Sequence, residues 1–311
     1  MDYYIYKLTF LTAVHFGEGS LSDSTNMIMA DTLFSALCCE AVDSGIVTPE
    51  KLVNYVENNK LLISDAMPYV NNKMYIPKPI FPVKSEEEGD SVIKKQFKKL
   101  KYIPFKKIDE YFKGNINPFS ENKYIKNMGK SEVRTLSALR NKDEAEPYFV
   151  GTYKFFENSG LYIIVGFGSK EIKEEFDILF KNLSFAGIGG KRSSGFGRFT
   201  FRIFSFKEEM LSVSVGAENP FYISLSISMA KDCEIKEAVY NSYYKLIKRS
   251  GFIYSDTYSN EYRKKRDFFV FQSGSCFSKP FEGGIFDVSG NSYNSGHKVY
   301  RYCKPLFLEV K

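Results

Sequence analysis

The chain has 311 residues, of which 43 are Lys or Arg and 37 are Asp or Glu, so its formal net charge is +6. That length suits two modest domains, and a hydrophobic fraction of 43% with 29 Phe and 22 Tyr excludes an intrinsically disordered chain. The N-terminus lacks signal-peptide features, polar residues interrupt every apolar stretch before it reaches membrane-spanning length, and five cysteines are an odd number for a disulfide framework. We therefore expect a cytoplasmic protein that does not contact a membrane.

The N-terminal segment predicts a strand, a loop and a helix. Residues 4–10 alternate with a period of two, which places the even-numbered side chains on one face of a strand. After a loop containing Gly and Ser, Asp31 is a plausible helix cap, and apolar residues at helical spacing run from Leu33 to Val42. Short strands are expected around residues 61–63 and 74–76.

The same types of pattern return after an interruption. Residues 149–156 and 161–167 are interpreted as a hairpin, and a helix with an apolar face is expected between Ile172 and Leu183. A Gly-rich loop and a strand over residues 198–206 follow. The resulting order is βαβ, an insertion and βαβ, which is typical of a ferredoxin-like unit.

A second unit begins after Pro220. Residues 221–229 alternate as a strand, a helix is expected over residues 235–247, and strand-like runs follow around residues 252, 268–271, 285–288 and 299–302. No second long helix is evident. We therefore predict an α+β fold of two ferredoxin-like (RRM-like) units in tandem: residues 1–208, with an insertion at about 84–146, and a degenerate unit over residues 216–311.

Positive charge is concentrated in the insertion. Between Ser91 and Arg134 there are twelve Lys or Arg and four acidic residues, a net charge of +8 that leaves −2 for the rest of the chain. A local basic segment is typical of a polyanion contact. It can also be the solvated face of an amphipathic helix, or a surface that contacts protein, and these alternatives stay open.

The motifs of metal and nucleotide sites are absent from the sequence. Only two histidines occur, no C-x-x-C or H-E-x-x-H spacing exists, and G-x-S-x-G is missing. The Gly-rich segment fails the tests for a phosphate-binding loop and for a dinucleotide fingerprint. We therefore expect neither a metal nor a cofactor, and no catalytic residue.

The Gly-rich loop over residues 185–198 is the most informative segment. Its sequence is Phe-Ala-Gly-Ile-Gly-Gly-Lys-Arg-Ser-Ser-Gly-Phe-Gly-Arg. Five glycines let a backbone pass close to a bulky ligand, while Lys191, Arg192 and Arg198 supply cationic donors suited to phosphate. The alternative, for this loop taken alone, is a tight connection whose basic residues are merely solvated.

A ferredoxin-like unit with this loop before its last strand resembles the RAMP superfamily of CRISPR-associated proteins. Within it, His-Phe-Gly at 15–17 followed by Ala-Asp-Thr-Leu-Phe-Ser-Ala-Leu at 30–37 resembles the family of the fourth Csm subunit of type III-A interference complexes. The C-terminal His-Lys-Val-Tyr-Arg-Tyr-Cys-Lys-Pro-Leu at 297–306 resembles the same family. Lys298 and Cys303 depart from the Pro and Gly expected there.

The resemblance implies a non-catalytic RNA-binding subunit that grips the 5′ repeat-derived tag of the CRISPR RNA (crRNA). It also implies contacts with the large polymerase-like Csm subunit and with a backbone Csm RAMP subunit. The RNA-binding residues it implies are His15, Gly187, Gly189, Gly190, Lys191, Arg192, Ser193, Ser194, Gly195, Arg198, Arg134 and Arg140. The alternative is a metal-independent endoribonuclease for repeat RNA that uses His15 as general acid or base.

Overall fold

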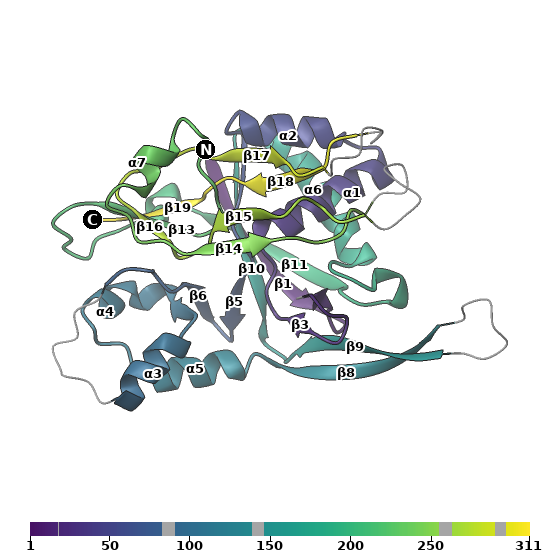
Figure 1. The fold of residues 1–311 in the computed structure, drawn as a ribbon, viewed down its shortest axis with the longest axis horizontal. Coiled ribbons are helices and arrows are strands. Elements are labelled where there is room, and N and C mark those ends of the chain that lie inside the picture. Colours follow the sequence, from purple (N-terminus) through teal and green to yellow (C-terminus); the bar gives the residue numbers. More distant parts are fainter. Residues whose placement is uncertain (18, 83–90, 139–145, 255–262, 290–296) are drawn as a thin grey trace.

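The computed structural model describes residues 1–17, 19–82, 91–138, 146–254, 263–289 and 297–311 (Figure 1). Its centre is a seven-stranded sheet in which all pairs are antiparallel and the strand order is β11-β1-β10-β5-β6-β7, with β4 also paired to β10. These strands are β1 (Asp2–Phe10), β4 (Leu61–Ile63), β5 (Met67–Val70), β6 (Lys73–Pro77), β7 (Tyr102–Pro104), β10 (Ser159–Phe167) and β11 (Phe199–Phe206).

Three helices cover one face of this sheet: α1 (Ala30–Ser44), α2 (Pro49–Glu57) and α6 (Lys170–Ala186). The even-numbered side chains of β1 point toward them, as the alternation predicts. Tyr6 is fully buried and meets the rings of Phe176 and Phe180 edge-on, each at 5.3 Å between centroids. The strand predicted over residues 4–10 and the helices predicted from Leu33 to Val42 and from Ile172 to Leu183 are therefore confirmed as elements. None of the helices in the described residues is long and apolar enough to span a membrane.

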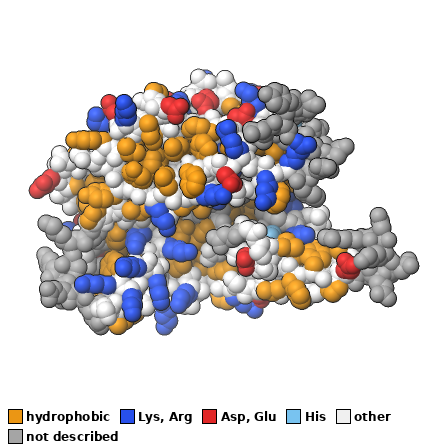
Figure 2. Space-filling view, viewed as in Figure 1, with side chains coloured by type: hydrophobic (Ala, Val, Ile, Leu, Met, Phe, Trp, Pro, Cys, Tyr) orange, Lys and Arg blue, Asp and Glu red, His pale blue; other side chains and the backbone are white. Residues whose placement is uncertain are grey.

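The insertion packs against the other face. It contains α3 (Ser91–Lys99), β7, a 3-10 turn (Phe105–Lys107), α4 (Ile108–Phe112) and α5 (Pro118–Lys126). Its buried apolar side chains, such as Ile103 and Ile108, share a core with Ile5 and Ile164 of the sheet. No residue of α3 is buried, and Figure 2 shows Lys and Arg side chains gathered over the insertion at the lower left.

The predicted hairpin between residues 149–156 and 161–167 is wrong. Strand β9 (Glu146–Phe155) pairs along its whole length with β8 (Gly129–Ala138) of the insertion, and the two form a ribbon that extends away from the body (Figure 1). Strand β10 instead lies between β1 and β5. The chain turns at Asn158, in a left-handed conformation with φ 57°, and leaves the ribbon for the sheet.

The second half is built from short strands. A four-stranded sheet has the order β12 (Ser212–Val213), β19 (Phe307–Val310), β13 (Phe221–Ser224), β16 (Cys276–Phe277). Two further pairs of strands in this half join β14 (Leu246–Arg249) to β15 (Phe268–Phe271) and β17 (Gly284–Asp287) to β18 (Tyr300–Cys303). In the first half, β2 (Phe16–Gly17) pairs with β3 (Ser24–Thr25). A further 3-10 turn spans Glu208–Leu211.

The predicted helix over residues 235–247 is wrong beyond Val239. Helix α7 spans only Ile235–Val239, and residues 246–249 form β14. Tyr243 exchanges backbone hydrogen bonds with Cys276, at 2.8 Å in both directions. Tertiary strand pairing therefore overrides the helical spacing of the apolar residues.

A buried polar cluster joins the two halves. The predicted cap Asp31 does not cap α1: Met29 is the N-cap residue, and Asp65 accepts a hydrogen bond from the Ala30 amide at 2.8 Å. The Asp31 carboxylate instead accepts from Arg249, at 3.0 and 2.8 Å, and from Arg301 at 2.6 Å. Burial alone would raise the pKa of Asp31, but the two guanidinium groups hold it below its ordinary value.

Candidate nucleic-acid interface

The Gly-rich loop connects α6 to β11 and folds back on itself. Ile188 donates from its amide to the Gly197 carbonyl at 3.0 Å. Gly187 and Gly197 have φ values of 88° and 77°, and a Cβ on Gly197 would stand 2.1 Å from the Ile188 oxygen. Glycine is therefore required at these two positions by the fold of the loop itself.

The loop also packs directly against the segment that contains His15. The Gly190 amide donates to the His15 carbonyl at 2.8 Å, and the Gly197 amide donates to Ala13 at 2.9 Å. A Cβ on Gly189 would lie 2.7 Å from the His15 oxygen, and one on Gly190 would lie 2.7 Å from His15 Cδ2. The sequence suggested that glycine here lets a ligand approach the backbone, but at Gly189 and Gly190 the close neighbour is the protein's own chain.

The tip of the loop remains open. Lys191 has a left-handed conformation with φ 60°, and a 3-10 turn over Arg192–Ser194 follows before Gly195, with φ 82°. Within the described residues, the amides of Lys191, Arg192 and Ser193 enter no backbone hydrogen bond. Ser193 and Ser194 are exposed and Gly195 is half-buried. Backbone amides beside two cationic side chains are suited to phosphate oxygens.

Cationic side chains at the tip lie over aromatic rings from distant parts of the chain. The Lys191 ammonium lies 4.6 Å from the ring centroid of Tyr148 in β9. The Arg192 guanidinium lies 5.3 Å from the ring of Tyr254 in the second half. Within the described part of the chain, no salt bridge joins either cation to a carboxylate.

The ribbon brings Arg134 to the same site. Its guanidinium lies 5.4 Å from the ring of Phe196 in the Gly-rich loop, and its nearest carboxylate is Glu132 at 3.8 Å. Arg198 is exposed where the loop enters β11. Arg140 lies outside the described residues. The structure thus brings together His15, the Gly-rich loop and Arg134, which are far apart in the sequence.

His15 lies beneath the loop rather than on the surface. Its side chain is 6% exposed, and Nδ1 stands 2.6 Å from the carbonyl oxygen of Gly151 in β9. Because a carbonyl oxygen only accepts, Nδ1 donates this hydrogen bond. A Cβ on Gly151 would lie 2.1 Å from the Ser22 oxygen. His15, in the segment after β1, therefore contacts the Gly-rich loop through its backbone carbonyl and the ribbon through its side chain.

Sequence reasoning missed the aromatic partners of the site. Neither Tyr148 nor Tyr254 carries a signal in the sequence, because a single Tyr in a polar stretch is unremarkable. Both were recognisable only from their positions beside Lys191 and Arg192.

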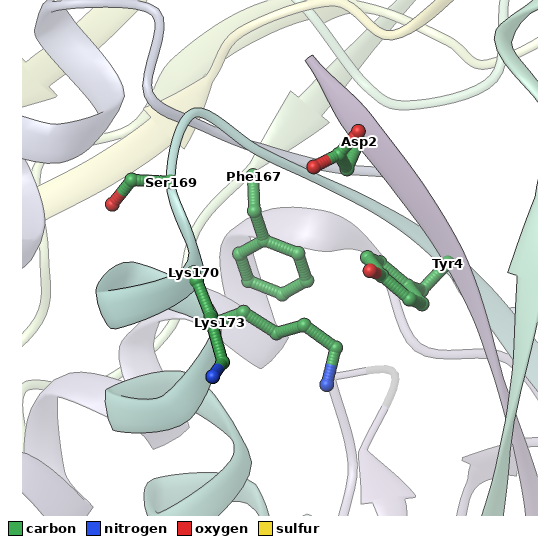
Figure 3. Close-up of a pocket in the computed structure, with 6 residues that line it drawn as sticks. All are labelled: Asp2, Tyr4, Phe167, Ser169, Lys170 and Lys173. Atoms are coloured by element: carbon green, nitrogen blue, oxygen red, sulfur yellow. The ribbon is translucent and has the colours of Figure 1, made fainter.

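A shallow cavity of about 190 Å³ lies at the other end of β1 (Figure 3). It is lined by Asp2, Tyr4, Phe167, Ser169, Lys170 and Lys173. Lys173 is engaged there by Asp177, at 2.6 Å, and by the Tyr4 ring, at 4.8 Å. None of the residues proposed from the sequence lines this cavity. Among the described residues, no group of three His, Cys, Asp or Glu side chains could hold a metal ion.

Two protein-family models match the chain. The RAMP superfamily model matches residues 7–200, and the model described as CRISPR Csm4 C-terminal domain matches residues 217–310. The CRISPR system Cms protein Csm4 of Mycobacterium tuberculosis is 35% identical over 297 residues, which cover 95% of this chain and 94% of the relative. The protein of the same description from Streptococcus thermophilus is 32% identical over 318 residues, with 100% of both chains covered.

Solved structures share the fold. A chain in the crystal structure of a Csm3-Csm4 subcomplex of the type III-A CRISPR-Cas interference complex matches with a TM-score of 0.62 and 18% identity, covering 99% of both chains. A chain in the crystal structure of a Csm1-Csm4 cassette in complex with cA4 matches with a TM-score of 0.58 and 17% identity, covering 99% of this chain and 97% of that one. The α+β architecture, in which most strand pairs are antiparallel, is thus that of these structures.

Proposed function

The chain belongs to the Csm4 family of the RAMP superfamily, as its sequence resemblance indicated, and we propose that it is a non-catalytic RNA-binding subunit. In this proposal it grips the 5′ repeat-derived tag of the crRNA and joins a large polymerase-like subunit to the backbone RAMP subunits. Relatives solved together with Csm1 and with Csm3 support the choice of partners.

The observation that carries the proposal is the tip of the Gly-rich loop. Lys191 and Arg192 have no carboxylate partner within the described residues, and each lies over an aromatic ring. Single-stranded RNA is held by amides and cations on its phosphates, while aromatic rings receive its bases. The loop, His15 and Arg134 combine these features at one site, and Arg140 is proposed to extend it.

The proposed fold is two ferredoxin-like units, residues 1–208 and 216–311, the second degenerate. In the first, the strand order β11-β1-β10-β5 supports the proposal, because it places the first and third strands of the βαβ-βαβ sequence at the centre. The basic insertion interrupts this unit between β6 and β10. In the ribbon, β8 of the insertion pairs with β9, which follows the insertion.

Replacing Lys191 and Arg192 by Ala tests whether the tip of the Gly-rich loop binds RNA. RNA carrying the repeat-derived tag should bind the wild type more tightly than a scrambled RNA, and the double variant should lose this binding. Since each phosphate contact to a single strand contributes about 0.7 to the slope of log K against log salt, the slope should fall by about 1.4. Lys181→Ala/Lys236→Ala, which removes two exposed lysines from α6 and α7, is the matched control. An unchanged slope in a folded Lys191→Ala/Arg192→Ala protein would refute the proposed site.

The endoribonuclease alternative predicts that the chain itself cuts repeat RNA. His15 is buried and its Nδ1 is occupied by the Gly151 carbonyl, which favours a supporting role over proton transfer to RNA. We expect the purified chain to leave repeat RNA uncut when incubated without metal. A specific cut that His15→Ala abolishes would establish the nuclease instead.

A further inference from the structure

The sheet face opposite α1 and α6 is only partly covered. Toward one end of β1 and β11, Ile5 and Phe206 are buried against the insertion and the second half. Toward the other end, the register places Lys7 opposite Arg202 on this same face. Arg202 is exposed and Phe204 retains 45% of its surface. The open part of the sheet therefore presents two cations and an aromatic ring.

Lys7 and Arg202 are an unfavourable pair in the isolated chain. Directly opposite side chains on neighbouring strands have Cβ atoms about 5 Å apart, where like charges repel. Burial and the charge of Arg202 both lower the pKa of Lys7. Neither cation forms an ion pair with a carboxylate in the part of the chain that the structure describes, and the Lys7 ammonium lies 4.1 Å from the ring centroid of Tyr69. An external anion would relieve this repulsion.

The pair is continuous with the Gly-rich loop. Strand pairing extends beyond the ends of β1 and β11, because the Leu11 amide donates to the Arg198 carbonyl at 2.8 Å. Arg198 directly precedes β11 and continues its pairing with the end of β1, so it lies four residues before Arg202, about 13 Å away at the rise of an extended chain, and the two-residue alternation places both side chains on the same face. Arg198, the last residue of the Gly-rich loop, and the Lys7–Arg202 pair thus form one basic track.

We infer that Lys7 and Arg202 bind phosphodiester groups of a single-stranded RNA that continues from the Gly-rich loop across the open part of the sheet. Phe204 provides a flat apolar surface for one of its bases. This inference rests on the proposed function, because the loop supplies the first part of the path. Charge complementarity and continuity with the loop favour RNA over an acidic protein segment, and stacking on Phe204 tolerates any base.

The experiment compares a short RNA that carries the tag alone with the same RNA extended at its 5′ or its 3′ end by a uridine tract. The variant Lys7→Gln/Arg202→Gln removes the track, and Lys181→Gln/Lys236→Gln is the charge-matched control. Binding is measured by fluorescence anisotropy over a range of salt concentrations. Thermal unfolding checks the fold, and the track variant should be at least as stable as the wild type, because the repulsion is gone.

We expect one of the two extensions to tighten binding to the wild type and to the control. The track variant should lose this gain and lower the salt slope for the extended RNA by about 1.4, with the short RNA bound as before. If the short RNA bound but neither extension added affinity, or if the track variant kept the gain, this inference alone would be wrong. If the wild type bound neither RNA, the proposed function would fail with it. If the track variant bound both RNAs normally but no longer assembled with a partner subunit, the track would be a protein contact instead.

Discussion

Asp65 offers a test of how the two halves are joined. Its Oδ1 accepts hydrogen bonds from the amides of Ala30 in α1, at 2.8 Å, and of Ile227 in the second half, at 3.1 Å. Burial raises the pKa of Asp65 to about 6, from an ordinary value of 3.8, and the amide donors offset only part of this effect. A carboxyl group whose folded pKa is raised stabilises the fold below its unfolded pKa and loses that contribution as the pH rises through its folded pKa.

The substitution Asp65→Asn keeps the Oδ1 acceptor and removes the ionisation. A shift of about two pKa units corresponds to ~3 kcal/mol. We therefore expect the free energy of unfolding of Asp65→Asn, relative to that of the wild type, to grow by ~3 kcal/mol between about pH 4 and pH 7. Urea denaturation of both proteins across this range measures the difference, and Asp232→Asn, at an exposed position, is the control. A difference that stays constant or shrinks as the pH rises would refute the reasoning.

Three further predictions concern the Gly-rich loop, the cluster around Asp31, and His15. Gly189→Ala and Gly195→Ala both place a side chain at positive φ, but only the Cβ on Gly189 meets a neighbour, 2.7 Å from the His15 oxygen. The Tm should therefore fall further for Gly189→Ala than for Gly195→Ala, and equal Tm values would contradict the contact. Asp31→Ala leaves the buried Arg301 and the half-buried Arg249 without their shared carboxylate, so urea denaturation should show a loss of about 3–5 kcal/mol. A loss below ~1 kcal/mol would argue against the cluster. His15→Ala should keep target-RNA cleavage in a reconstituted complex, and loss of cutting with assembly and crRNA intact would place catalysis on this chain.

Local patterns predicted the elements whose burial depends on one periodic face. The alternation in β1 and the helical spacing in α1 and α6 identify which side chains face the core, whatever packs on them. The same patterns failed where a strand could pair with either of two other strands. Strand β9 is an apolar run next to a turn, which fits pairing with β10 equally well, and only the presence of β8 in the insertion decides between them.

The candidate site likewise has features that the sequence predicts and features that only the fold reveals. The family and the type of loop could be identified from the sequence, since the glycines, Lys191 and Arg192 lie close together in the chain. The packing of Gly189 and Gly190 against His15, and the positions of Tyr148 and Tyr254 beside the cations, became visible in the folded chain alone. The physical reason is that periodicity and local composition record which side chains are buried or charged, whereas a close approach between distant segments is fixed by the packing of the whole chain.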